Sequence, residues 1–229
     1  MPFIQLFFII LTFTLPLALA WGGKRWRHPA YEWAVRRILA FALIAVEIFD
    51  HIAKIFDGTF TFQHALPLQL CDWALFVTVA ALLFRSQRAF ELAYFWGLAG
   101  TIQALFTPAV GSDLPLWRLA GFFGSHSGIV IGVLYLILAE GCRPKPRSLI
   151  RVFLWCQLYL AAALLANHAF DANYGFLSKK PSTHTLLDFL SDEPRLYVLQ
   201  LEGLAILFFL ILYTPWWVVD LVRNRRPAP

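Results

Sequence analysis

The chain has 229 residues, of which 59% are hydrophobic and only 14% are charged. Water-soluble domains carry about 25% charged residues, so this composition excludes an ordinary soluble globular domain. The net charge of +5 comes from 19 Lys and Arg against 14 Asp and Glu. The basic residues cluster beside apolar runs, as in loops next to anionic lipid, so the charge indicates no nucleic-acid partner.

Apolar runs of about 18 residues or more recur along the chain, and each is long enough to cross a hydrocarbon layer of roughly 30 Å as a helix. We therefore expect an all-α, polytopic membrane helix bundle of about seven transmembrane helices, forming a single domain over residues 1–229. The connections are short, except for residues 169–195. The predicted spans lie near 3–21, 34–51, 66–84, 91–110, 118–139, 149–168 and 196–219.

The first span ends in LALAW, which resembles a signal-peptide cleavage site. The region before it has no Lys or Arg, and cleavage would leave the following KRWR cluster outside the membrane, against the positive-inside rule. We therefore expect residues 3–21 to be a retained helix.

Basic residues determine the predicted orientation. The segments that follow the first, third, fifth and seventh spans, with the adjoining span ends, contain 14 of the 19 Lys and Arg. Cytoplasmic loops are enriched in these residues, so we expect the N-terminus outside and the C-terminus in the cytoplasm, most simply in a bacterial plasma membrane. The residues are Lys24, Arg25, Arg27, Arg36, Arg37, Arg85, Arg88, Arg143, Lys145, Arg147, Arg151, Arg223, Arg225 and Arg226.

In this orientation, polar residues collect in the outer halves of six spans, while the inner halves are expected to be almost pure hydrocarbon. Ionisable side chains at membrane depth are rare and usually face a cavity or a pathway. The sequence therefore predicts a pocket open to the outer leaflet or the outer surface. The main candidates are Glu47, Asp50, His51, Gln69, Cys71, Asp72, Gln103, Ser125, His126, Asn167 and Asn173.

The segment LPLQLCDW places Cys71 at the start of the third span. From a rise of 1.5 Å per residue, Cys71 lies roughly 8 Å and His126 roughly 12 Å below the starts of their predicted spans. A thiol with an ordinary pKa of about 8.5 needs a base to act as a nucleophile at pH 7. Because His126 can accept that proton, we identify the two as the candidate catalytic pair.

Other polar residues are candidates for supporting roles. A carboxylate would orient the imidazole and stabilise its charged form, and Glu47, Asp50 and Asp72 all remain candidates. Glu47 and His51 are four residues apart and should share one helix face. Groups that donate hydrogen bonds to a developing oxyanion form a further set. Its candidates are Gln69, Gln103 and Ser125, with Asn167 and Asn173 nearby at the outer end.

The same residues have structural interpretations. Cys71 can be a small packing residue, and Asp72 can be a first-turn carboxylate favoured by the helix dipole. The small residues around His126, in GSHSG, can permit close helix packing. These interpretations stay open beside the catalytic one.

No metal site, cofactor or structural disulfide is predicted. His51 and His64 could bind a metal with a nearby carboxylate, but the HxxxH and HExxH spacings are absent. Cys142 and Cys156 lie in or near the predicted cytoplasmic half, where thiols stay reduced, and Cys71 has no evident partner.

Several stretches together resemble the bacterial YwaF-like integral membrane family, over roughly residues 30–215 and in the same order. They are HALPLQLCDW, YFWGLAGTIQALFTP, FFGSHSGIVIGVLY, EGCRPKPRSLIRVF, NxxxDxNYGFLSKKPxTxxLLDFL and LEGLAILFFLILY. That family is similar to the eukaryotic transmembrane protein 164, described as a glycerophospholipid acyltransferase. The resemblance implies an acyl-enzyme mechanism with Cys71 as nucleophile and His126 as base.

The leading hypothesis is thus a Cys/His-dependent acyltransferase or acyl hydrolase that acts on glycerophospholipids from the outer leaflet. The alternative is a non-enzymatic transporter or small-ligand binding protein, whose outer polar groups form a vestibule. The apolar inner half counts against conduction. A purely structural or assembly role is the third possibility.

Overall fold

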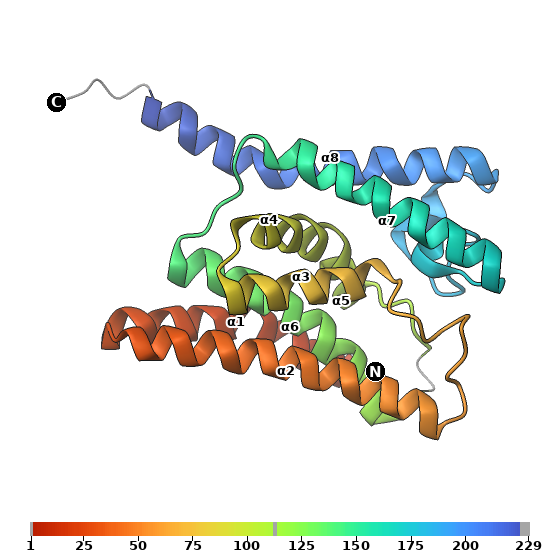
Figure 1. The fold of residues 1–229 in the computed structure, drawn as a ribbon, viewed down its shortest axis with the longest axis horizontal. Helices are drawn as coiled ribbons and strands as arrows, with labels where there is room; N and C mark the ends of the chain where they lie inside the picture. Colours follow the sequence, from red (N-terminus) through yellow and green to blue (C-terminus); the bar gives the residue numbers. More distant parts are fainter. Residues whose placement is uncertain (1, 112–113, 225–229) are drawn as a thin grey trace.

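The computed structural model describes residues 2–111 and 114–224, and every regular element in these ranges is a helix (Figure 1). Four of the helices are long and apolar enough to cross a membrane: Phe3–Trp26, Leu116–Glu140, Ser148–Phe170 and Pro194–Val222. The prediction of an all-α, multi-pass integral membrane protein is therefore confirmed. The elements are α1 (Pro2–Trp26), α2 (Pro29–Phe56), α3 (Leu70–Phe84), α4 (Gln87–Trp96), the π-helical turn η1 (Gly97–Thr101), α5 (Ile102–Phe106), α6 (Leu116–Glu140), α7 (Ser148–Phe170), the 3₁₀ turns η2 (Tyr174–Phe176) and η3 (Leu186–Phe189), and α8 (Pro194–Asn224).

Three of the seven predicted spans correspond to less regular elements, so the number seven stays a prediction. Helix α2 is long enough but has polar residues along its second half. Helix α3 has 15 residues, which at 1.5 Å each cover only about 22 Å of a hydrocarbon layer of roughly 30 Å. The fourth span is helical from Gln87 to Phe106, and the π-helical turn η1 interrupts it.

The predicted start of the third span at residue 66 is wrong, because α3 begins only at Leu70. Pro67 has no backbone N–H and disfavours a helical residue before it. The preceding segment is instead held by tyrosines: the Leu66 N–H donates to the Tyr174 hydroxyl at 3.0 Å, and the Tyr159 hydroxyl donates to the Leu68 carbonyl at 3.2 Å. Cys71 is therefore the second residue of α3, in its first turn, and not several residues further into the helix.

Helix α6 is the centre of the bundle and packs against α1, α2, α3 and η1. Of the 18 consecutive residues that form the most apolar part of α6, 56% are buried, whereas the corresponding part of α8 is only 11% buried. Two glycines permit the close approach: a Cβ atom on Gly128 would lie 2.7 Å from Leu43 Cδ2, and one on Gly132 would lie 2.8 Å from Thr78 Cγ2. In Figure 1, α7 and α8 lie on the far side of α4 from α1 and α2.

Ion pairs that involve two buried carboxylates, Glu91 and Glu140, join helices at one end of the bundle. This end consists of the last turns of α1, α3 and α6 and the first turns of α2, α4 and α7, and we call it the basic end. Arg36 Nε lies 3.2 Å from Glu140 Oε1, and Arg85 also contacts Glu140 at 3.3 Å. Glu91 is only 1% exposed and pairs with Arg151 at 2.5 Å. The expectation of an almost pure hydrocarbon inner half is therefore wrong at this end.

The predicted cytoplasmic segments come together at the basic end. Arg143, between α6 and α7, contacts Asp220 of α8 at 2.5 Å. Arg225 and Arg226, which also entered the orientation argument, lie outside the described residues. The structure contains no membrane, so the orientation itself stays a prediction.

Candidate functional site

Cys71 is the second residue of α3, and this helix start rests on the π-helical turn. Leu70 Cδ2 would lie 3.4 Å from a Cβ atom on Gly100. Thr101, the last residue of η1, is completely buried, and its hydroxyl lies beside the Cys71 thiol. Within the described ranges, the Thr101 oxygen has no hydrogen bond of good geometry. Such π-helical turns occur frequently at functional sites.

The loop after α7 holds the segment that leads into Cys71. Asn167 is buried and accepts a hydrogen bond from Tyr174 N at 2.6 Å, while its amide donates to the Tyr174 carbonyl at 3.0 Å. The Tyr174 hydroxyl in turn donates to the Phe62 carbonyl at 2.7 Å. Gln69 Oε1 accepts from Gly175 N at 2.9 Å. Two predicted site residues, Asn167 and Gln69, therefore position the chain around Cys71.

Gly175 is a glycine for a geometric reason. Its φ angle is +64°, in the left-handed region, and a Cβ atom there would lie 2.5 Å from the Tyr159 hydroxyl. A side chain at this position would displace the tyrosine that holds Leu68.

Asp72 caps α3. Its Oδ2 accepts a hydrogen bond from the Gln69 N–H at 2.8 Å. A carboxylate at this position also interacts favourably with the N-terminal helix dipole. The structural interpretation of Asp72 is thus confirmed, and it answers why an acidic residue follows Cys71.

His126 lies in the N-terminal half of α6 and is 9% exposed. Its Nδ1 lies 2.7 Å from the Phe122 carbonyl and 3.2 Å from Ser125 Oγ. Because a carbonyl only accepts, Nδ1 carries the proton, and Nε2 of the neutral ring keeps its lone pair. Nε2 makes no hydrogen bond to any residue in the described ranges. Phe122 and not a carboxylate therefore orients the ring.

The packing of α3 against α6 relates the two candidate catalytic residues. The helices run in the same direction, since Thr78 faces Gly132 and, further along, Arg85 pairs with Glu140. The same register, extended toward the helix starts, brings Cys71 level with His126. This register agrees with the matching level expected from the sequence, and the common level of the two residues stays a prediction.

The two residues also approach the same neighbour. His126 occupies one stripe of α6 with Phe123 and Val130, which pack with Leu98 and Ile102 around η1. Thr101 of that turn lies beside Cys71, as described above. No hydrogen bond links the Cys71 sulfur to the His126 ring among the described residues, so the catalytic pairing stays a prediction.

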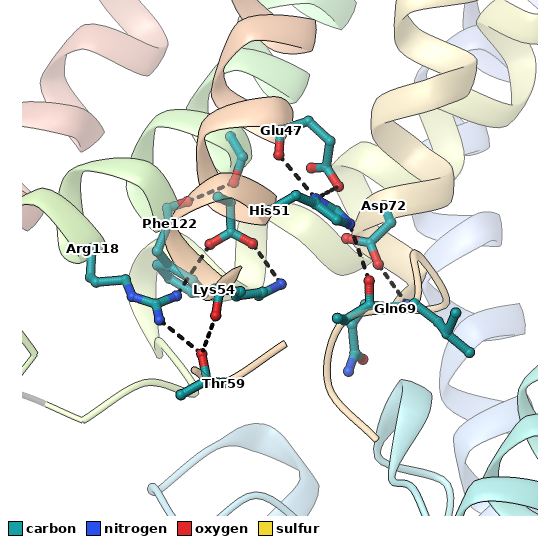
Figure 2. A network of polar contacts seen from close by, with 12 residues as sticks. Glu47, His51, Lys54, Thr59, Gln69, Asp72, Arg118 and Phe122 are labelled. Carbon is teal, nitrogen blue, oxygen red and sulfur yellow. Dashed lines mark hydrogen bonds and ion pairs between the residues drawn. The ribbon is translucent and has the colours of Figure 1, made fainter. Parts of the chain in front are cut away.

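A charged cluster on α2 lies beside the start of α3 (Figure 2). Glu47 Oε1 is 3.4 Å from His51 Nδ1, which confirms the predicted pairing on one helix face. Figure 2 shows Asp72 next to this pair. His51 also contacts the carbonyls of Glu47 and Ala65 through its two ring nitrogens, at 3.0 and 3.1 Å.

Asp50, the third carboxylate candidate, belongs to a second ion-pair network, at the end of α2 and the start of α6. It contacts Lys54 at 2.6 Å and Arg118 at 3.7 Å, and Arg118 also pairs with Asp57 at 2.6 Å. These charges neutralise one another. No group of three or more His, Cys, Asp or Glu in the described ranges is arranged to hold a metal ion.

Two predicted site residues, Asn173 and Gln103, take no part in the hydrogen bonds around Cys71 and His126 that the described residues form. Asn173 organises its own loop by accepting from Ser178 N and Lys179 N, at 3.0 and 3.1 Å. Gln103 lies on α5, and its side chain has no hydrogen bond to the described part of the chain.

Sequence reasoning missed Thr101, Tyr159 and Tyr174. The small residues of GLAGT indicate close packing, yet nothing in the sequence shows that this turn is π-helical or that its threonine approaches Cys71. The tyrosines act through contacts about 90 or more residues away in the chain.

Comparison with known proteins identifies relatives of the whole chain. Residues 2–213 match the TMEM164 family. An uncharacterized protein from Treponema pallidum (strain Nichols) is 27% identical over 224 residues, which cover 95% of this chain and 85% of that protein. No solved structure matches the chain.

Proposed function

Because the chain belongs to the TMEM164 family, we propose that it is a membrane-embedded acyltransferase or acyl hydrolase of glycerophospholipids, with Cys71 as nucleophile and His126 as base. The observation that carries the proposal is the common level of Cys71 and His126 on two parallel helices that both pack against η1. The similarity to transmembrane protein 164 supplies the reaction class.

The first half of the reaction transfers the acyl group to the enzyme. The Cys71 sulfur attacks the ester carbonyl of a phospholipid, and its proton passes to Nε2 of His126. The tetrahedral intermediate collapses, the ester C–O bond breaks, and the leaving alkoxide takes the proton from His126. The products are a thioester on Cys71 and a lysophospholipid.

The second half returns the enzyme to its initial state. A hydroxyl group of an acceptor lysolipid attacks the thioester while His126 removes its proton, and the Cys71 thiolate then leaves and is reprotonated. With water in place of the acceptor, the same steps give hydrolysis. Catalytic hydrogen bonds are often long without substrate and tighten in the complex, so the unbonded state of the pair is compatible with these steps.

Thr101 and Phe122 supply the polar support that the steps require. The Thr101 hydroxyl can donate to the Cys71 thiolate, because it has no other partner among the described residues. The Phe122 carbonyl holds Nδ1–H and stabilises the imidazolium that forms on His126. By the distribution of basic residues, the substrate would enter from the outer leaflet of a bacterial plasma membrane.

The vestibule alternative receives less support. A binding or conducting vestibule requires charges that are available to a ligand, whereas Asp50, Lys54, Arg118 and Asp57 pair with one another. At the other end of the bundle, Arg36 and Glu140 are likewise paired with each other.

Trapping the acyl-enzyme tests the proposal. The protein is reconstituted with a phospholipid that carries an isotope-labelled acyl chain, quenched in acid, and analysed by peptide mass spectrometry. We expect a labelled acyl group on Cys71 that neutral hydroxylamine removes, and acyl transfer should be abolished in Cys71→Ala.

Cys142→Ala is the matched control, because this cysteine follows the last turn of α6 at the basic end and lies away from the site. Acyl transfer by Cys71→Ala at the rate of the unmodified protein would contradict the proposal. Ligand flux that survives in Cys71→Ser proteoliposomes, with no acyl transfer by the unmodified protein, would favour a transporter.

A further inference from the structure

A cavity of about 330 Å³ lies at the basic end, where α1 ends, α2 begins and α6 completes its last turn. In Figure 1 this is the end at which α1 and α2 meet, opposite to the end of α2 that approaches the start of α3. The cavity is therefore separate from Cys71 and His126. Its lining residues are Ala20, Gly23, Lys24, Arg27, His28, Pro29, Glu32 and Ala139.

Aromatic packing holds the walls of this cavity in place. The Tyr31 hydroxyl donates to the Leu19 carbonyl at 3.0 Å, and the Tyr31 ring packs edge-on against Trp26. A Cβ atom on Gly22 would lie 2.5 Å from the Tyr31 hydroxyl, so only glycine permits this approach. The cavity thus belongs to a folded elbow between two helices and not to a loose surface loop.

The polar lining is mainly cationic. Lys24 and Arg27 form no ion pair with any residue in the described ranges. His28 Nδ1 accepts a hydrogen bond from the Ala30 N–H at 3.2 Å, so in the neutral ring Nε2 carries the proton and is a donor. The first turn of α2 adds the positive end of a helix dipole. Glu32 is the acidic lining residue and leaves a net charge of about +1.

A buried hydroxyl lies near the cavity, on the helix that supplies its lining residue Ala139. Tyr135 precedes the lining residue Ala139 by one helical turn on the same face of α6. The Tyr135 side chain is completely buried, and its oxygen has no hydrogen-bond partner in the described ranges. Glu32 is among the charged groups around it. An unpaired buried hydroxyl is unfavourable unless something bonds to it.

We propose that this cavity binds the phosphodiester group of an anionic phospholipid from the leaflet at the basic end. A phosphodiester has one negative charge, which matches the net charge of the lining, whereas a free phosphate or monoester has about −1.5 to −2. Trp21 and Trp26 are 70% and 65% exposed on α1. Exposed tryptophans in this position mark the headgroup region, so the cavity opens where lipid phosphates lie.

Lipid retention measured by native mass spectrometry tests the proposal. The protein is placed in nanodiscs with equal amounts of phosphatidylglycerol and phosphatidylcholine, and the lipids that stay bound after release are counted. The unmodified protein should retain phosphatidylglycerol preferentially. In Lys24→Gln/Arg27→Gln this preference should fall about tenfold, the loss expected from one charge-assisted hydrogen bond.

The matched control is Arg25→Gln/Arg147→Gln, which removes two charges from the same end of the bundle but none from the cavity. Its preference should stay within about twofold of the unmodified protein, because diffuse surface charge is screened by salt. Tyr135→Phe changes no charge and should weaken the preference several-fold. If the Lys24→Gln/Arg27→Gln variant does not fold, Tyr135→Phe still provides a test of the cavity.

Three results would overturn the proposal. Equal losses in the cavity pair and the control pair would mean that general attraction to anionic lipid explains the binding. Equal retention of the two lipids by the unmodified protein would show that the cavity does not select anionic phospholipid. Thermal stabilisation by inorganic phosphate in phosphatidylcholine nanodiscs, abolished by Lys24→Gln/Arg27→Gln, would assign the cavity to a soluble anion. None of these readouts depends on acyl transfer.

Discussion

The two ends of the bundle bury different kinds of polar groups, with ion pairs between helices at the basic end and a threonine hydroxyl beside a thiol at the end that holds Cys71. At the basic end, Glu91 pairs with Arg151 and Glu140 pairs with Arg36, so the main buried charges neutralise each other across helices. At the end that holds Cys71, the Thr101 hydroxyl lacks a hydrogen bond within the described chain. Paired charges hold helices together, whereas an unpaired polar atom next to a thiol is available to a substrate.

This difference gives the polar residues of the molecule separate roles. Breaking a pair at the basic end should reduce stability, and removing a polar atom at the Cys71 end should reduce activity without unfolding the protein.

The replacement His126→Gln should lower the rate of acyl transfer by about 10²–10⁴-fold, because the proton of Cys71 loses its acceptor. Membrane insertion and thermal unfolding should stay unchanged. The rate is measured with labelled phospholipid in proteoliposomes. His184→Gln, on an exposed loop, is the control and should retain full activity. A normal rate in His126→Gln would separate this residue from the chemistry.

Replacement of Arg151 by Met should destabilise the protein by about 3 kcal/mol, since Glu91 is left buried without its partner. Denaturant unfolding in detergent measures the change. The double variant Glu91→Gln/Arg151→Met should recover most of the loss, because it removes both charges. If the single variant is as stable as the unmodified protein, the ion pair contributes nothing to holding α4 against α7.

Thr101→Val removes one hydroxyl and keeps the shape of the side chain. Acyl transfer should fall up to about tenfold, the effect of one hydrogen bond to the thiolate. Stability should be unchanged or slightly higher, because an unpaired buried hydroxyl is lost. Thr101→Ser keeps the hydroxyl and should retain activity. Lower stability with normal turnover would instead indicate that Thr101 only packs.

Local sequence patterns predicted much of the fold. Apolar runs placed the long helices, and the spacing of Glu47 and His51 predicted their pairing. The predicted start of α3 was four residues too early, because residues 66–69 are mostly apolar and continue the hydrophobic run. Pro67 in this segment is unsuited to a helix. Tyr174 and Tyr159, which hold that segment, are more than 90 residues further along the chain.

The candidate site was only partly predictable. Cys71 and His126 stood out because a thiol and an imidazole are unusual among apolar residues, and their common level follows from the packing of α3 on α6. Which groups orient them was not evident, since a main-chain carbonyl of Phe122 serves where a carboxylate was expected. Every residue has a main-chain carbonyl, so the sequence does not show which carbonyl bonds to His126.

The order of apolar and polar residues is enough to identify a helical, multi-pass membrane protein, because hydropathy and helix formation depend on neighbouring residues. Which polar atoms are paired depends on how the helices pack. Glu91 meets Arg151 across 60 positions, and the Thr101 hydroxyl meets the Cys71 thiol across the packing of η1 on α3. Hydrogen bonds and ion pairs act over a few ångströms in space, and the fold alone determines which distant residues come that close.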